Sequence, residues 1–199
     1  MSTGIQFLHN FGIKYLMMPF TGQLIENRIF IHDLHQSRSL FGDGYYGKPL
    51  GISKPKNTDF DSPLVLDLIE GYYLNLNKKL DVFKHNGTVV TSDEILKECK
   101  KQYMNFEVKF KVFQSLRDKG YIVTPGIKFG CDFAVYIHGP GIDHAPFLVK
   151  VLIHNEKLTS IDIVLAGRLA TTVKKQFVLA IVNQKQGSLK FVGFDWWRA

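Results

Sequence analysis

The chain has 199 residues and a formal net charge of +7, and 45% of its residues are hydrophobic. This length suits one larger domain or two small ones, with enough apolar residues for a core. No run of eighteen apolar residues is present and the first twenty residues lack a signal-peptide pattern, so we expect no membrane segment. Cys99 and Cys131, the only cysteines, cannot build a four-thiolate zinc site and fit a reducing cytoplasm, where we expect the protein.

The charge is distributed unevenly. Residues 1–86 contain 9 Lys and Arg against 8 Asp and Glu, whereas residues 87–199 contain 16 against 10, a net charge of +6. A basic second half indicates a polyanionic partner, most simply nucleic acid. A charge that serves only solubility would give the same count, so charge alone leaves both interpretations open.

The first half predicts a small α+β module. Residues 24–31 are expected to form a strand, residues 33–41 a short helix, and the Gly-, Pro-, Lys- and Asn-rich residues 42–61 a long loop. Ser62-Pro63, an N-cap followed by proline, predicts a helix of about 14 residues that starts there and runs to Leu76.

The second half predicts helices that alternate with strands. We place the domain boundary near residues 85–89. Thr91 and Glu94 have capping-box spacing and start a helical segment that should end at Gly120. Ser160 is expected to cap a helix through about Lys174, with Ile161, Val164, Leu165, Leu169 and Val173 on one face. The other apolar segments predict the strands of a mixed sheet: residues 121–124, 127–136, 147–154, 177–182 and 189–196.

Three polar side chains of this half could carry chemistry. Tyr136 ends a predicted strand, His144 lies in a Gly- and Pro-rich loop, and Lys175 comes at the end of a predicted helix. An exposed histidine exchanges protons near neutral pH, as general acid catalysis requires. Each has an ordinary interpretation when taken alone: a packing tyrosine, a surface histidine and a lysine that complements a helix dipole.

Four segments in this order resemble the C-terminal domain of the archaeal and eukaryotic tRNA-splicing endonucleases. They are residues 116–123, 126–136, 144–149 and 168–175. The first half is similar to the same family through residues 45–51 and 64–76, so the resemblance covers most of the chain. It implies an α/β protein from an archaeal source. Residues 1–86 would form an α+β structural domain, and residues 87–199 a catalytic domain with a restriction-endonuclease-like mixed sheet.

The resemblance assigns the family's catalytic Tyr, His and Lys to Tyr136, His144 and Lys175. It implies RNA cleavage without metal or cofactor, in which the 2′-hydroxyl attacks and a 2′,3′-cyclic phosphate and a 5′-hydroxyl remain. Tyr136 would act as or position the base, His144 would protonate the leaving oxygen, and Lys175 would balance transition-state charge. Arg168 and Arg198 match positions proposed to bind the substrate, precursor tRNA with a bulged intron–exon junction. Arg168 lies seven residues before Lys175, on nearly the same expected helix face.

One departure from the family pattern concerns assembly. Self-assembling relatives carry an acidic loop between the last two strands, which docks into a basic cleft of an opposing subunit. Here residues 182–188 hold no carboxylate and one lysine, Lys185, so this loop does not complement a basic cleft. We expect a catalytic subunit that pairs with a structural subunit in a two-plus-two heterotetramer. The apolar segment 189–197 would face a neighbouring subunit, or alternatively be buried in its own core.

Two other functions remain open. A metal-dependent nuclease on a similar sheet needs carboxylates around a divalent cation, often an acid two positions before a lysine. Asp132 could serve, but Leu148 stands two positions before Lys150. A non-catalytic RNA-binding or structural subunit of the same assembly would have no reason to keep the three candidate catalytic residues together.

Overall fold

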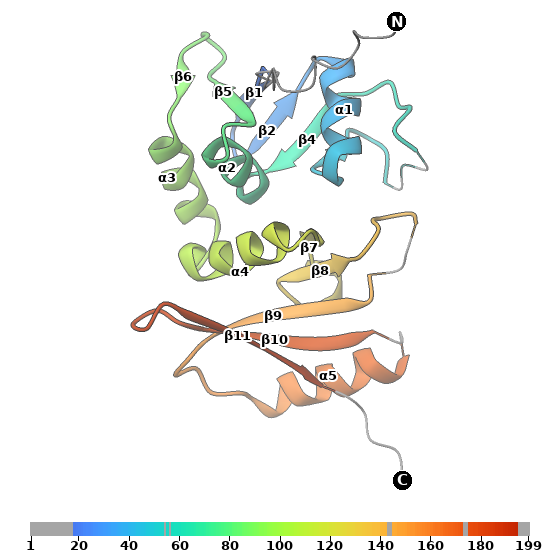
Figure 1. The fold of residues 1–199 in the computed structure, drawn as a ribbon, viewed down its shortest axis with the longest axis vertical. Helices are drawn as coiled ribbons and strands as arrows, with labels where there is room; N and C mark the ends of the chain where they lie inside the picture. Colours follow the sequence, from blue (N-terminus) through green and yellow to red (C-terminus); the bar gives the residue numbers. More distant parts are fainter. Residues whose placement is uncertain (1–17, 54, 56, 143–144, 173–174, 195–199) are drawn as a thin grey trace, which may run out of the picture.

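The computed structural model describes residues 18–53, 55, 57–142, 145–172 and 175–194. These residues form two mixed sheets with helices packed against them (Figure 1). Helix α2 packs on the first sheet, helix α4 packs on the second, and the two helices meet between the sheets. The arrangement confirms the predicted α/β class, with a mixed sheet in each half of the chain. Within the described ranges, no helix is long and apolar enough to cross a membrane.

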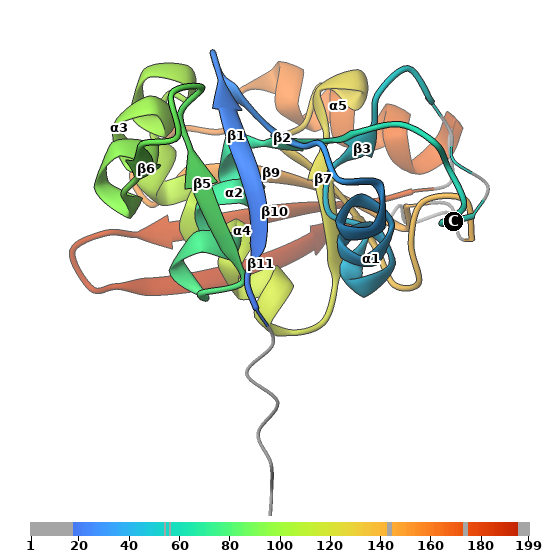
Figure 2. The same ribbon diagram turned by 90° about the horizontal axis from the view of Figure 1, so that it is seen from above.

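The first sheet comes from the N-terminal half of the chain. Its strand order is β3-β4-β2-β1-β5-β6, with β1 and β5 parallel and the other neighbours antiparallel. Figure 2 looks onto this sheet from above, with β1 and β5 nearest the viewer. The elements are β1 (Phe20–Ile25), β2 (Arg28–Ile31), α1 (Leu34–Gly44), β3 (Lys48–Pro49), β4 (Leu64–Asp67), α2 (Leu68–Leu76), β5 (Leu80–Phe83) and β6 (Val89–Val90).

Two predictions for this half are wrong. Residues 24–31 belong to the hairpin of β1 and β2, because Glu26 adopts a left-handed backbone with φ of 52° and the chain turns there. The helix expected from Ser62-Pro63 starts later, since the segment that follows is strand β4, paired with β2. Asp67 caps α2 through a capping box with Glu70, so these two residues set the true start of the helix.

The turn between β5 and β6 falls at the expected domain boundary. The N–H of Lys84 donates to the carbonyl of Thr88 (2.8 Å), and β5 and β6 pair within the first sheet. Because β6 belongs to that sheet, the sheet extends past residue 86. The division into residues 1–86 and 87–199 stays a prediction.

The helical segment after residue 91 is two helices. Thr91 and Glu94 form the expected capping box at the start of α3 (Ser92–Gln102). Asn105 then adopts a left-handed backbone with φ of 55°, and α4 (Phe106–Asp118) leaves in a different direction (Figure 1). Helix α4 ends just before Gly120, as predicted.

The second sheet has the order β11-β10-β9-β8-β7, with β9 and β10 parallel and the other neighbours antiparallel. Helix α5 (Ser160–Thr172) connects β9 to β10 and covers the face opposite to α4 (Figure 1). The strand expected over residues 127–136 is divided, because a short 3-10 helix, Ile127–Phe129, precedes β8. The strands are β7 (Ile122–Pro125), β8 (Phe133–Tyr136), β9 (Phe147–Ile153), β10 (Gln176–Asn183) and β11 (Ser188–Phe194).

Strand β11 lies at one edge of this sheet. Its residues are half-buried or exposed, and Val192 is 43% exposed. Leu189, Phe191 and Phe194 pack against the hydrophobic clusters of the same chain, so the described part of the last strand is partly covered by its own core and partly exposed. Trp196 and Trp197, which the sequence adds to this strand, lie outside the described residues.

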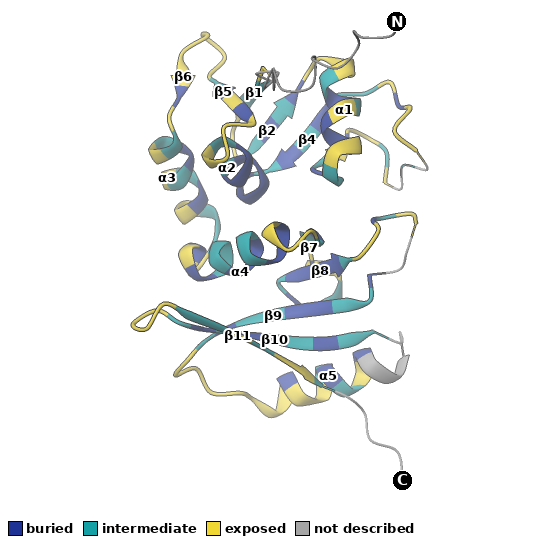
Figure 3. Ribbon diagram, in the orientation of Figure 1, coloured by how far each residue is buried: buried dark blue, intermediate teal, exposed yellow. Residues whose placement is uncertain are grey.

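Helix α5 departs from the prediction at its start and in its buried face. Thr159 rather than Ser160 caps it: the Asp162 carboxylate accepts from the Thr159 N–H (2.9 Å), and the Asp162 N–H donates to Thr159 Oγ1 (3.3 Å). The described part of the helix runs to Thr172, and residues 173 and 174, where the predicted end falls, lie outside the described residues. Ile161 and Val164, expected on the inner face, are 76% and 69% exposed, which Figure 3 shows as the exposed side of α5.

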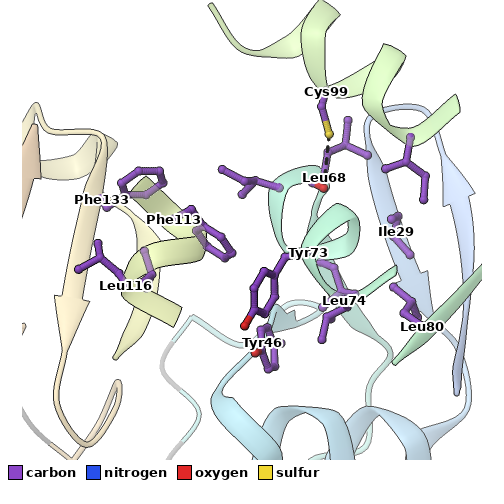
Figure 4. Packing of buried hydrophobic residues seen from close by; sticks show 14 of the residues in the cluster. Ile29, Tyr46, Leu68, Tyr73, Leu74, Leu80, Cys99, Phe113, Leu116 and Phe133 are labelled. Atoms are coloured by element: carbon purple, nitrogen blue, oxygen red, sulfur yellow. Dashed lines mark hydrogen bonds between the residues drawn. The ribbon is translucent and has the colours of Figure 1, made fainter. Parts of the chain in front are cut away.

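One hydrophobic core connects the two halves of the chain. The ring of Phe113, on α4, lies 5.7 Å from the ring of Tyr73 on α2 and 5.9 Å from the ring of Phe133 on β8, measured between centroids. Figure 4 shows Phe113 between these two neighbours. The same cluster of buried side chains reaches Ile29 in the first sheet and Val149 in the second. The two halves are therefore packed as one body.

Candidate active site

Tyr136 is the last residue of β8 and pairs with Ile122 of β7. Side chains alternate along a strand, so Phe133 and Val135 pack in the main core on the α4 side, whereas Ala134 and Tyr136 pack on the α5 side. Tyr136 is half-buried against the smaller hydrophobic cluster under α5. The predicted strand-end position of this tyrosine is confirmed.

His144 lies outside the described residues, and the loop that contains it is described on both sides. Residues 137–142 leave β8, and within them Gly139 is buried. Ala145, which follows His144 in the chain, is 3% exposed. Strand β9 starts at Phe147, which pairs with Val135 of β8. The loop therefore starts and ends at neighbouring positions of adjacent strands.

Lys175 lies just before β10, and it is not part of helix α5. Its ammonium group donates a hydrogen bond to the carbonyl oxygen of Ala145 (2.5 Å) and lies 5.4 Å from the centre of the Phe129 ring. Its backbone N–H donates to the carbonyl of Leu169 (3.3 Å). Lys175 is therefore fixed beside the residue that follows His144 in the sequence.

The strand register brings Tyr136 and Lys175 to the same end of the strands in the second sheet. Strand β9 lies between β8 and β10, and its first residue, Phe147, pairs with Val135 on one side and Gln176 on the other. One residue further out, the Pro146 carbonyl accepts from the Gln176 N–H (2.8 Å). Tyr136 and Lys175 thus flank the end of one strand, on backbones separated by roughly two strand spacings, about 10 Å. Both lie at alternating positions that face α5.

The two arginines predicted to bind RNA are placed differently from expectation. Arg168 is exposed on α5, but Lys175 is not part of that helix. The argument that Arg168 and Lys175 share a helix face is therefore wrong, because the chain leaves the helix before reaching the lysine. Arg198 lies outside the described residues.

The acidic residues around the second sheet have structural partners. The carboxylate of Asp132 accepts from the Val151 N–H (2.8 Å) and pairs with the Lys109 ammonium (2.8 Å). Lys150 is bonded to Asp162, and this bond holds the pKa of the Asp162 carboxyl down, at about 2. Across the part of the chain that the structure describes, no three His, Cys, Asp or Glu side chains are grouped as metal ligands would be. Asp132 therefore serves to join α4 to β9.

The cysteine next to this aspartate is also structural. Cys131 is 6% exposed in the cluster under α5, and burial raises the pKa of its thiol to about 11. A thiol with this pKa is neutral at physiological pH and is a poor nucleophile. The structural interpretation of Cys131 is therefore supported.

Two groups at this edge were missed by sequence reasoning. The Ala145 carbonyl holds Lys175, and the Phe129 ring lies against the same ammonium. A backbone carbonyl leaves no signal in a sequence, because every residue has one. Phe129 stands inside a segment that resembles the family, but it belongs to a short 3-10 helix, and only the tertiary packing brings its ring to Lys175.

Both halves of the chain match known families. Residues 20–96 match the family model described as tRNA intron endonuclease, N-terminal domain, and residues 106–191 match tRNA intron endonuclease, catalytic C-terminal domain. The two family models, matched in this order, define the class of protein as an RNA-processing endonuclease. The chain belongs to the tRNA intron endonuclease family, which confirms the predicted resemblance.

Curated relatives named tRNA-splicing endonuclease extend over nearly the whole chain. The protein of Hyperthermus butylicus is 40% identical over 173 residues, which cover 87% of this chain and 96% of that protein. The protein of Sulfurisphaera tokodaii is 40% identical over 176 residues, covering 88% and 97%. That of Saccharolobus solfataricus is 37% identical over 174 residues, covering 87% and 96%. The expected archaeal source fits these relatives.

Proposed function

We propose that this chain is the catalytic subunit of an enzyme that excises introns from precursor tRNA without a metal ion. The observation that carries the proposal is the hydrogen bond from the Lys175 ammonium to the carbonyl of Ala145. It links Lys175 to the residue that follows His144, while strand register holds Tyr136 at the same edge. Tyr136, Lys175 and the residue that follows His144 are thus held at one end of the second sheet.

Each of the three side chains has a role that suits its chemistry. RNA supplies its own nucleophile, the 2′-hydroxyl beside the scissile phosphate. Tyr136 accepts or positions the proton of that hydroxyl, and His144 donates a proton to the leaving 5′-oxygen. Lys175 stabilises the negative charge that grows on the phosphorus oxygens as the new bond forms. The products are a 2′,3′-cyclic phosphate and a 5′-hydroxyl.

Substrate binding is assigned to the basic second half of the chain. Arg168 is exposed on the helix that covers the candidate site, where a planar guanidinium can stack on an unpaired base. Arg198 is proposed for the same role. The bulged intron–exon junction would be recognised by its shape and unpaired bases. Residues 1–86 would then provide architecture and residues 87–199 the chemistry, in the cytoplasm.

The test is cleavage of an intron-bearing precursor tRNA in excess chelator, with each variant assayed with and without a candidate structural subunit. Wild type should cut and leave cyclic phosphate ends, whereas His144→Ala should be slowed by about a hundredfold or more, the loss expected for a general acid. A substrate with a single 2′-deoxy nucleotide at the cleavage site should remain uncut, because its nucleophile is missing. Cleavage that needs a divalent metal, or that tolerates the 2′-deoxy substitution, would refute the proposal.

Assembly with a second, structural subunit is a separate part of this proposal. The hairpin between β10 and β11 is exposed and contains Lys185 without a carboxylate, and Asn183 Oδ1 accepts from the N–H groups of Lys185 and Gln186 (3.1 and 3.2 Å). A positively charged, preformed turn does not fit a basic cleft. Native mass measurement of the chain alone tests this: a tight and active homotetramer would exclude the heterotetramer.

A further inference from the structure

The loop that contains His144 rests on the N-terminal half of the chain. Gly139 packs so closely against Tyr45 that a Cβ atom on Gly139 would lie 2.6 to 2.9 Å from three carbons of the tyrosine ring. Two residues later, a Cβ on Gly141 would lie 3.4 Å from the carbonyl oxygen of Pro55. In Figures 1 and 2 the segment after β8 lies beside the loop that follows β3.

Tyr45 is itself held in place. It ends helix α1 with a left-handed backbone (φ 53°), and its N–H donates to the carbonyl of Phe41 (2.7 Å). The Phe41 ring lies edge-on to the Tyr45 ring, with 5.1 Å between centroids. From the second half of the chain, Arg117 donates to the carbonyl of Gly44 (2.7 Å), the residue before Tyr45. The tyrosine ring is therefore a fixed surface, braced from both halves.

The loop is also held at its other end. The Lys175 ammonium bonds the Ala145 carbonyl, and the Gln176 N–H bonds the Pro146 carbonyl. The described residues on either side of His144 in the sequence are thus held at Gly139 and at Ala145. Removal of either support would change the position of the histidine relative to the other catalytic residues.

We propose that Tyr45 is a positioning residue for the general acid His144, acting through its contact with Gly139. This inference rests on the proposed function. It assigns to the N-terminal half a role in the chemical step, in addition to architecture. Tyr45 touches no reacting atom in this scheme. It sets the place of the loop from which the proton is delivered to the leaving 5′-oxygen.

The contact is suited to this role because the three Tyr45 atoms nearest to Gly139 are ring carbons. Phenylalanine at position 45 would keep the surface on which Gly139 rests, and alanine would remove it. A displacement of about 1 Å in a catalytic group can lower a rate by roughly 100-fold. We therefore expect Tyr45→Phe to cleave like wild type and Tyr45→Ala to lose about 10- to 100-fold in single-turnover rate at saturating enzyme.

A matched control separates positioning from general loss of packing. Tyr72 is another half-buried tyrosine of the N-terminal half, packed at the edge of the same core, and its ring contacts Phe106 and Phe110. Tyr72→Ala removes a similar ring without touching the loop. It should be destabilised like Tyr45→Ala and still cleave at the wild-type rate below its melting temperature.

The decisive measurement uses a substrate that needs no general acid. When sulfur replaces the leaving 5′-oxygen, the 2′-oxygen still attacks phosphorus, the phosphorus–sulfur bond breaks, and the thiolate leaves without a proton. The assembled Tyr45→Ala enzyme should cut this substrate nearly as fast as wild type, and so should His144→Ala. Equal slowing of Tyr45→Ala on both substrates, or no slowing on either, would overturn the role of Tyr45.

The same experiment separates this inference from the proposed function beneath it. If sulfur restores His144→Ala but not Tyr45→Ala, the general acid assignment stands and the role of Tyr45 is refuted. If sulfur fails to restore His144→Ala, His144 is not the general acid, and both proposals fall together. Restoration of both variants supports the two proposals jointly.

Discussion

The guanidinium of Arg117 lies 3.8 Å from the carboxylate of Glu70, and both side chains are at least 95% removed from solvent. The carboxylate accepts from the N–H groups of Gly47 and Asp67 (3.0 Å each), and the guanidinium lies 4.1 Å from the centre of the Tyr46 ring. This pair joins α2 to α4, so a charged contact crosses between the two halves of the chain alongside the hydrophobic core.

This pair predicts a pH dependence of stability. Burial raises the pKa of Glu70 from 4.5 to about 7, outweighing the lowering effect of Arg117 and of the backbone N–H groups. The folded protein therefore holds a proton that the unfolded chain releases, and this contribution is complete below pH 4.5 and lost as the pH rises to about 7. It amounts to roughly 3 kcal/mol.

The measurement is the free energy of unfolding from pH 4 to 8 for wild type and Glu70→Gln. Glutamine keeps a carbonyl acceptor and cannot ionise. The stability of wild type relative to Glu70→Gln should fall as the pH rises through this window. A constant difference between the two proteins would show that Glu70 titrates normally.

The shared core predicts that the two halves unfold together. Phe113→Ala removes a ring that contacts Tyr73 in one half and Phe133 in the other. It should cost about 3–5 kcal/mol, the usual range for emptying a buried aromatic site. Hydrogen exchange measured on peptides from each half should show that both lose protection by the same amount. Loss confined to one half would mean that the halves unfold independently.

Asp132 distinguishes the proposed chemistry from the metal-dependent alternative. Asp132→Asn removes the ion pair with Lys109 and keeps an oxygen that can accept from Val151, so we expect a stability loss of about 1–3 kcal/mol. Cleavage per folded molecule in chelator should match wild type. Abolished activity in a folded Asp132→Asn protein, with metal added, would favour a metal-bound carboxylate.

Lys175 is predicted to stabilise the transition state. Lys175→Ala should lower the cleavage rate by about 100- to 1,000-fold, as loss of one such donor does in other enzymes, with little change in RNA affinity. Lys174→Ala is the matched control, because it removes the same charge one residue earlier. If Lys174→Ala proves the more damaging of the two, the catalytic lysine has been assigned to the wrong neighbour.

The fold was predictable where a local signal acts alone. The capping box of Thr91 and Glu94 starts α3 as expected, because its hydrogen bonds are made within one turn. The start of α2 was mistaken because Ser62-Pro63 also has cap character, while the pairing of Leu64–Asp67 with β2 depends on a strand far back in the chain. The hairpin of β1 and β2 was missed because Glu26 carries no turn signal.

The candidate site, like the fold, was predictable from the sequence only in part. Tyr136 was placed correctly at a strand end, and the family resemblance supplied Lys175 as a candidate. Lys175 was expected at the end of the helix, and the structure has it outside α5, just before β10. The contact of Tyr45 with Gly139 spans the two halves, and two residues so distant in sequence give no local pattern. Tertiary packing alone reveals it.

The single core that joins the two sheets also constrains how the sequence of such a protein can evolve. Phe113 and its neighbours belong to both halves at once. The C-terminal half without the N-terminal half would expose the hydrophobic surface around Phe113. It would also lose Tyr45, which packs against Gly139. Recombination between relatives would therefore have to transfer both halves together. A substitution on one side of their interface would require a matching substitution on the other side.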